Sequence, residues 1–244
     1  MLKFFRKIRQ KLLSQNRVTR YLVYALGEIF LVMIGILLAL KVNEWRDLRL
    51  KKEKELQTIN LLIRDLVDDE KNLQVFEFRL KEQETNVIKL LESINERKSI
   101  DSILNYTQGG LGIWLYRPSY PTYEGLKQSG SLDIISNPEM RDLIIQYHEE
   151  IVTYLDDLRE SYKIDNEKAR EAFEPYLGYS YRDGKWEQEG NFDPLHLASD
   201  KKAINLLSQA GKQRAWILTR LREIFFKENQ ALSDSLSNYK ASIN

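Results

Sequence analysis

The sequence from residue 21 to residue 42 reads YLVYALGEIFLVMIGILLALKV. About 20 mostly apolar residues are what an α-helix needs to cross the hydrocarbon core of a bilayer. Between Leu22 and Leu40, twelve residues are Leu, Ile, Val or Phe, and together they favour insertion by about 5 kcal/mol. One carboxylate, Glu28, opposes insertion by roughly 3 kcal/mol. The apolar contribution is larger, so residues 21–42 are predicted to form a transmembrane helix.

A signal peptide and the core helix of a soluble protein are the two alternatives for this stretch. The apolar run is longer than the hydrophobic region of a signal peptide, and no A-x-A-like cleavage site follows it. A transmembrane helix therefore fits better and divides the chain into three parts. These are a basic amphipathic segment (residues 1–20), the transmembrane helix (21–42) and a soluble domain (43–244).

The polar and small residues of the predicted span share one face. At about 100° per residue, Tyr24, Glu28, Gly35 and Ala39 lie on one stripe, opposite the large aliphatic side chains. Gly35 and Ala39 form a small-xxx-small pair, which lets another helix approach closely. We expect this stripe to pack on a second transmembrane helix, from another copy of the chain or from a protein partner. The alternatives are a tolerated, protonated Glu28 near the headgroups and a proton relay.

Residues 1–20 are basic and contain no acidic residue. Apolar side chains recur among the cations at helical spacing, which predicts an amphipathic helix on the surface of an anionic leaflet. A nucleic-acid-binding patch is the alternative, but lipid is the expected partner beside a transmembrane helix. The cations assigned to the membrane surface are Lys3, Arg6, Lys7, Arg9 and Lys11.

The charge balance predicts the orientation in the membrane. Residues 42–244 carry 29 Lys and Arg against 35 Asp and Glu, whereas the basic charge of residues 1–20 is unopposed. Short basic segments stay on the cytoplasmic side. The N-terminus is therefore predicted to be cytoplasmic and the soluble domain to lie across the membrane.

Residues 44–97 contain neither glycine nor proline and are predicted to form a long helix. One apolar line recurs every seven residues, at Ile59, Leu66, Leu73, Leu80, Val87 and Ile94. The companion line that begins at Leu56 turns acidic at Glu70, Glu77 and Glu84. This favours a helix within a bundle over a plain two-stranded coiled coil, whose two lines are both apolar.

The rest of the soluble domain contains helix start and stop signals. Asn137-Pro138 begins a helix that runs to about residue 177, and Gly130 ends a short helix capped by Thr122. Asp183-Gly184 is the turn of a hairpin. A short helix from Asp200 to about Ala210 and a final helix at 212–241 follow. The predicted fold is all-α: the transmembrane helix, then an antiparallel bundle of three long helices with short helices and a small hairpin-like insertion.

Signals for catalysis or cofactors are weak. Without cysteine there is no thiolate nucleophile or thiolate zinc site. His148 could join Asp156 or Asp157 at a metal, but the spacing matches no known metal motif, and His196 is the only other histidine. Residues 109–112 read GGLG and are expected to be a loop, since they lack the P-loop pattern. We therefore predict a non-enzymatic protein with no cofactor and no metal.

Aromatic residues gather in two regions, around residues 114–123 and 179–186. They could cap the core or form a binding surface, since Tyr and Trp are frequent at interfaces. The candidate partner surface consists of Trp114, Tyr116, Tyr181 and Trp186.

Three stretches carry a resemblance to a known family. They are KFFRKIRQKLL at the start, GEIFLVMIGILLALKVNEW in the span and TYEGLKQSGSLDIISN in the soluble domain. The chain resembles an uncharacterised family of single-pass membrane proteins from Gram-negative Bacteroidetes, which share the basic start and an Asn-x-Trp end of the span, here Asn43-Glu44-Trp45. The resemblance implies an inner-membrane protein with a periplasmic domain of unknown function, and it supplies no site residue.

Two functions remain in competition. The first is a membrane-anchored protein-interaction or scaffold module of the cell envelope. The second is a sensor-like bundle that binds a ligand and acts through a transmembrane partner. A deep apolar cavity within the bundle would favour the sensor, and an exposed aromatic surface without such a cavity would favour the interaction module.

Overall fold

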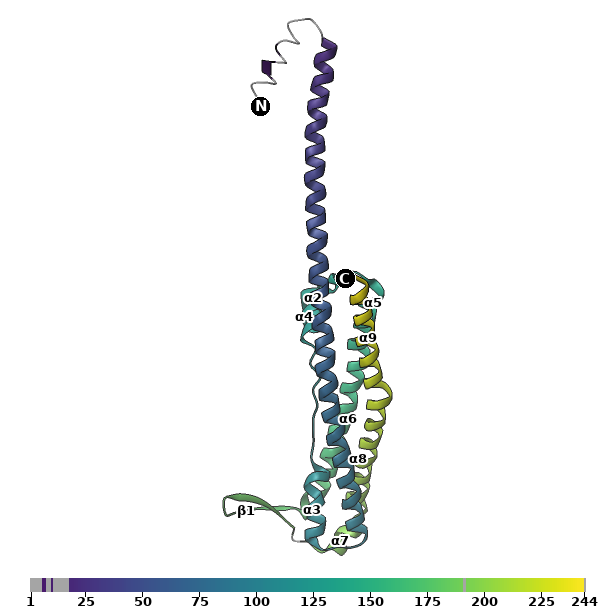
Figure 1. Ribbon diagram of the computed structural model, residues 1–244. Coiled ribbons are helices and arrows are strands. Elements are labelled where there is room, and N and C mark those ends of the chain that lie inside the picture. The colour runs from purple at the N-terminus through teal and green to yellow at the C-terminus, as the bar shows by residue number, and fades with distance from the viewer. Residues whose placement is uncertain (1–5, 8–9, 11–17, 191, 244) are drawn as a thin grey trace. The chain divides into compact units, whose positions relative to one another are not determined.

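The computed structural model describes residues 6–7, 10, 18–190 and 192–243 (Figure 1). It forms two compact units, Met1–Lys54 and Glu55–Asn244. Helix α2 (Val18–Asn95) contributes to both. The fold is all-α with one small two-stranded hairpin, as the sequence predicts.

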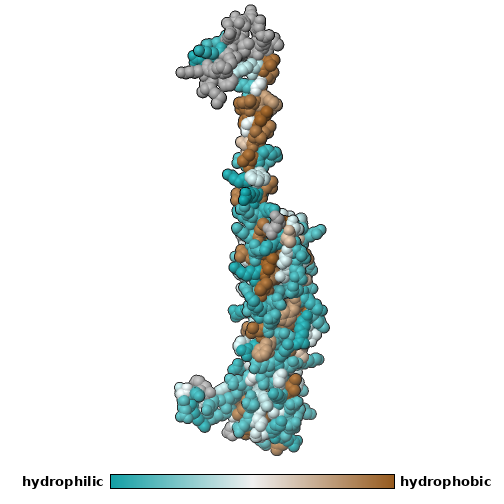
Figure 2. Space-filling model, in the orientation of Figure 1, coloured by the Kyte–Doolittle hydropathy of each residue, from teal (hydrophilic) through white to brown (hydrophobic). Residues whose placement is uncertain are grey.

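The first unit contains the apolar part of α2. Its length and composition allow it to cross a membrane, and no residue of its most apolar part is buried. The large apolar side chains from Leu22 to Leu40 are all exposed, which is rare for a helix of a soluble protein. This stretch is brown, and so hydrophobic, in Figure 2.

The second unit is a bundle of three long helical rods. The first is α2 from Glu55 onward, the second combines α5 (Pro138–Gln146), η2 (Tyr147–Ile151) and α6 (Val152–Phe173), and the third combines α8 (Lys201–Arg220), η4 (Leu221–Phe225) and α9 (Phe226–Ile243). The third rod is antiparallel to the first, because Tyr239 contacts Glu55 and Arg222 contacts Glu77. It is also antiparallel to the second, since α5 packs on α9 and α6 on α8.

A fourth path between α2 and α5 is only partly helical. It consists of α3 (Ile100–Leu111), a connecting segment (residues 112–120), α4 (Pro121–Ser129) and the short turn η1 (Leu132–Ile134) (Figure 1). The remaining elements are η3 (Glu174–Tyr176), β1 (Gly178–Arg182), β2 (Lys185–Glu189) and α7 (Pro194–Ser199), which link the second and third rods.

The predicted heptad line of α2 is confirmed. Its six members from Ile59 to Ile94 are all at most 1% exposed and belong to the three apolar core clusters. The predicted companion line is wrong, because the members of the second buried line lie four residues before those of the first line rather than three before them. That line consists of Glu55, Leu62, Asp69, Phe76, Gln83 and Leu90.

Two glycine-rich points that were expected to break helices lie inside helices. Gly110 is part of α3, and Gly211 is part of α8, so the expected helices at 200–210 and 212–241 are one rod. A Cβ on Gly110 would lie 3.4 Å from a Val87 methyl carbon, and one on Gly211 would lie 3.0 Å from the other. These glycines allow α3 and α8 to pack closely on α2 around Val87.

Most of the predicted turns and helix ends are confirmed. Asp183 and Gly184 adopt φ values of 47° and 78° between β1 and β2, which is the geometry of a two-residue hairpin turn. Gly130 ends α4 in the left-handed conformation, and Asn137 caps α5 through the Met140 amide. Thr122 does not cap α4, which begins at Pro121; its backbone amide donates instead to Asp65.

Candidate functional site

The connecting segment is fixed to α2 by buried side chains. Gln83 donates to the carbonyl oxygen of Gly112 at 2.8 Å and accepts from the Tyr162 hydroxyl at 2.7 Å. That hydroxyl accepts in turn from the Trp114 amide at 3.1 Å. Because a buried backbone group without a partner costs about 1–3 kcal/mol, these bonds determine where the segment enters the bundle.

Asp69 fixes the other end of the segment. Its carboxylate accepts from the hydroxyls of Tyr116 and Tyr120, the latter at 2.5 Å. One turn earlier, Asp65 accepts from the amide of Thr122 at 2.9 Å. Asp69 is 2% exposed, and burial raises its pKa to about 6, although the hydrogen bond from Tyr120 acts in the opposite direction.

A third polar residue of the same line binds the chain before α5. Glu55 accepts from the Ser136 amide at 2.6 Å, from the Ser136 hydroxyl at 2.8 Å and from the Tyr239 hydroxyl at 2.6 Å. Glu55, Asp69 and Gln83 are spaced fourteen residues apart on α2, and we call them the polar line. Each one binds a non-helical part of the fourth path, so the polar line positions that path along α2.

The π-helical turn η2 brings two consecutive side chains into the core beside Asp69. Tyr147 and His148 are both buried. Tyr147 lies 3.3 Å from the Tyr120 hydroxyl and accepts from Asn229 at 3.1 Å. The His148 ring stacks on Tyr123 with centroids 4.0 Å apart.

The alternative of a metal role for His148 has no support in this geometry. Its Nδ1 lies 2.7 Å from the Ile144 carbonyl oxygen, and burial lowers its pKa to about 4. In the described residues no three His, Cys, Asp or Glu side chains are grouped for a metal ion. His196 lies on α7 beside the Tyr176 ring.

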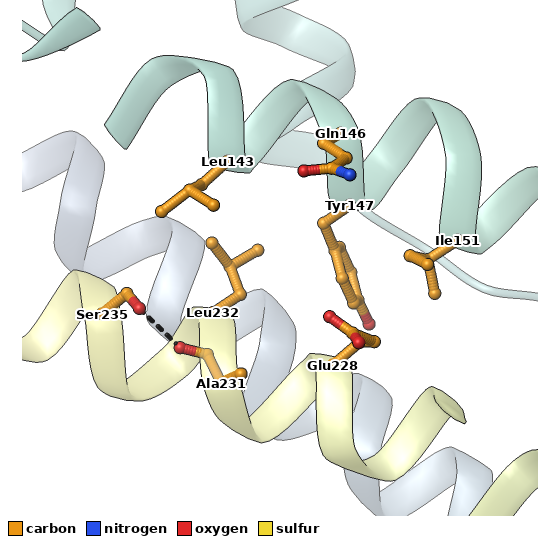
Figure 3. Close-up of a pocket in the computed structure, with 8 residues that line it drawn as sticks. All are labelled: Leu143, Gln146, Tyr147, Ile151, Glu228, Ala231, Leu232 and Ser235. Atoms are coloured by element: carbon orange, nitrogen blue, oxygen red, sulfur yellow. Dashed lines mark hydrogen bonds between the residues drawn. The ribbon is translucent and has the colours of Figure 1, made fainter. Parts of the chain in front are cut away.

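A shallow groove borders the tyrosine network between the second and third rods (Figure 3). Its cavity volume is about 160 Å³. Tyr147 forms one wall, and its hydroxyl lies 3.3 Å from that of Tyr120, which donates to Asp69. The lining residues are Leu143, Gln146, Tyr147, Ile151, Glu228, Ala231, Leu232 and Ser235.

A second groove lies between α2 and the connecting segment, and we call it the Trp114 groove. Its volume is about 260 Å³. Val75, Trp114 and Leu115 are 58%, 49% and 43% exposed, and the Arg79 guanidinium lies 4.6 Å from the Trp114 ring centroid. The lining residues are Asn72, Val75, Phe76, Arg79, Trp114, Leu115, Tyr116 and Arg117.

The structure separates the members of the predicted partner surface. Trp114 is at the rim of its groove, whereas Tyr116 is only 8% exposed and stacks on Phe76. Tyr116 is therefore part of the core side of the groove and not of an open surface, because its hydroxyl is held by Asp69. Tyr181 is exposed on β1, paired with residue 186 in the hairpin, and it does not line the Trp114 groove. The Trp186 side chain lies outside the described part of the chain.

The residues predicted to act at the membrane lie on the first unit. Glu28, Gly35 and Ala39 are exposed on α2, Tyr24 is half-buried, and a Cβ built on Gly35 has no heavy atom within 4 Å. Arg6 and Lys7 are helical and exposed. The predictions for Lys3, Arg9 and Lys11 fall outside the described residues.

A buried cation was missed by the sequence reasoning. Arg214 on α8 is fully buried; it donates to the Gly110 carbonyl at 2.6 Å and to the Asn166 side chain. Burial lowers its pKa. A lone arginine at helical spacing usually faces solvent, so no local sequence signal could have placed it in the core.

Comparison of the chain with protein-family models, with curated proteins and with solved structures finds no match. Function therefore has to be argued from the two grooves and the apolar helix.

Proposed function

We propose that the protein is a membrane-anchored, non-enzymatic interaction module of a bacterial cell envelope. Residues 21–42 cross the inner membrane, residues 1–20 lie on its cytoplasmic surface, and the bundle is periplasmic. The fully exposed apolar stretch of α2 supports the anchor, and the unopposed basic charge before it supports the orientation. The resemblance to Bacteroidetes membrane proteins agrees with this location.

The observation that carries the interaction role is the exposed Trp114 groove. Trp114, Leu115 and Val75 expose apolar surface beside one another, and contiguous exposed apolar surface is typical of interaction sites. A sensor would instead need an enclosed cavity that buries most of a ligand. The grooves described in residues 55–243 open to the surface, so the interaction module is favoured.

Site-specific photocrosslinking in native membranes tests this role. A photoreactive amino acid at Leu115 should give a discrete crosslinked protein band, whereas the same amino acid at Ile164, an exposed apolar position on α6, should not. Identical bands at the two positions, or none at Leu115, would refute the proposal. Alkaline phosphatase fused after residue 244 should be active if the bundle is periplasmic.

We further propose that the Tyr24–Glu28–Gly35–Ala39 stripe packs on a second transmembrane helix. The open space around Gly35 leaves room for a close approach. In a membrane two-hybrid assay, Gly35→Leu and Glu28→Leu should weaken self-association, while Leu37→Ala, on the opposite face, should not. Unchanged association in the first two variants would exclude a homo-oligomer through this stripe.

A further inference from the structure

We infer that the Trp114 groove binds a short acidic segment of another protein, which inserts one large apolar side chain beside Trp114. This inference rests on the proposed interaction role and adds the chemistry of the partner.

The groove is large enough and apolar enough for one side chain. Its volume of about 260 Å³ exceeds the roughly 150 Å³ of an engineered apolar cavity that holds benzene. Phe76 and Tyr116 form its inner side, and Val75 and Leu115 are exposed at its rim. An aromatic or long aliphatic side chain would therefore be buried on several sides, as interface anchors commonly are.

The charges at the rim specify an acidic partner. Arg79 and Arg117 line the groove, and no acidic residue does. This is a local exception on a net acidic soluble part, which carries 29 basic against 35 acidic residues. A basic rim on an acidic domain attracts acidic segments, while the rest of the surface repels them.

Both arginines are available to a carboxylate. Arg117 is exposed and forms no ion pair within the part of the chain that the structure describes. Arg79 pairs with Glu82 at 3.0 Å, but this is an exposed contact within one helix, and such pairs contribute little. A guanidinium offers two parallel donors to a carboxylate, so the two arginines can bind acidic residues that flank an inserted side chain.

The wall of the groove is fixed before any partner arrives. The Trp114 amide is bonded to Tyr162, and the Tyr116 hydroxyl is bonded to Asp69. The Tyr116 ring also stacks on Phe76, with centroids 5.7 Å apart. Since the segment is already ordered, binding loses little conformational entropy on this side of the interface.

Trp216 provides a matched control within the same chain. It is also exposed and also has an arginine near its ring, with the Arg220 guanidinium 5.5 Å from the centroid. Its surface hollow, however, includes Asp165 and is not purely basic. An acidic segment should therefore select Trp114 and ignore Trp216.

The test uses the full chain in neutral detergent micelles and fluorescent peptides of about twelve residues in a polarisation assay. The probe carries one central Phe flanked by Asp and Glu; its two controls replace Phe by Ser or the acids by Lys. The probe should bind at least about tenfold more tightly than either control, and less tightly as salt increases. Arg117→Glu and Trp114→Ser should each weaken binding at least about tenfold, while Trp216→Ser leaves it unchanged.

Several results would overturn the inference. Equal binding of the acidic peptide and the lysine peptide, or unchanged binding of the acidic peptide by Arg117→Glu, would exclude an acidic partner. A crosslink from Leu115 to a second copy of the chain would show that the groove binds another copy of this protein. Competition by vesicles of anionic lipid would show that it binds a membrane. If Leu115 crosslinks to another protein but no acidic peptide binds, the partner chemistry is wrong and the interaction role stands.

Discussion

Asp69 and His148 should have opposite effects on how stability depends on pH. Both are buried in the tyrosine network beside η2. Burial raises the pKa of Asp69 from 3.8 to about 6 and lowers that of His148 from 6.5 to about 4. The folded protein thus prefers both groups uncharged, and acidification affects them in opposite ways.

The sign follows from which state binds the proton more tightly. The folded state binds the Asp69 proton more tightly than the unfolded state, so the stabilisation by this group is full below about pH 4 and is lost as the pH rises through about 6. The unfolded state binds the His148 proton more tightly, so stability falls as the pH drops below about 6.5. With shifts of two units or more, each effect amounts to about 2 kcal/mol between pH 7.5 and 4.5.

The two effects nearly cancel in the wild type, and single substitutions separate them. Relative to wild type, Asp69→Asn should lose about 2 kcal/mol of unfolding free energy on going from about pH 7.5 to about pH 4.5. His148→Gln should gain a similar amount over the same range. The ion pairs and capping carboxylates elsewhere are common to all three proteins, so they drop out of the differences.

Urea unfolding of the full chain in detergent micelles, followed by tryptophan fluorescence, gives these free energies. The double variant serves as the control, because its difference from wild type should change little with pH. A difference between Asp69→Asn and wild type that is constant over this range would show that Asp69 ionises normally. The raised pKa assigned to the buried Asp69 carboxyl group would then be refuted.

Three further predictions concern stability and use the same measurement. Asn137→Ala should cost about 1 kcal/mol because it removes the cap of α5, whereas Thr122→Ala should change stability by less than about 0.5 kcal/mol. Gly130→Ala should cost about 1 kcal/mol at φ 64°, whereas Gly125→Ala, within α4 and with open space around the added Cβ, should stabilise by about 0.5–1 kcal/mol. Gln83→Leu should cost about 2–4 kcal/mol although it makes the heptad more apolar, because it removes the hydrogen-bond partner of the half-buried Gly112 carbonyl and the acceptor of the buried Tyr162 hydroxyl.

Features that depend on a few neighbouring residues could be predicted from the sequence. The Asp183-Gly184 turn, the Gly130 stop and the Asn137-Pro138 start are local chemistry and appear where expected. The heptad line from Ile59 to Ile94 also holds, because burial of one helix face imposes its period whatever the partner.

Features that depend on residues distant in the sequence could not be predicted. The wrong companion line was chosen because a heptad leaves two candidates, three or four residues before each member of the first line, and both contain acidic residues. In the structure the line with Asp69 is buried, since tyrosines from the connecting segment supply its hydrogen bonds. Likewise Gly110 and Gly211 serve close packing on Val87, which no local pattern distinguishes from a helix break.

The Trp114 groove and the polar line have one physical origin, the unwound fourth path. Gly112 is bonded to residue 83 of α2, and Thr122 is bonded to residue 65. Eighteen residues of helix span about 27 Å, so the ten steps from 112 to 122 must be nearly extended, at about 2.7 Å per residue against about 3.3 Å for a full strand. An extended chain leaves backbone groups unpaired, which Gln83 and Asp65 satisfy. It also covers less of α2 than a helix would, which leaves Val75 exposed. A continuous helix on this path would cover Val75 and close the groove, so the site exists because the fourth helix is missing.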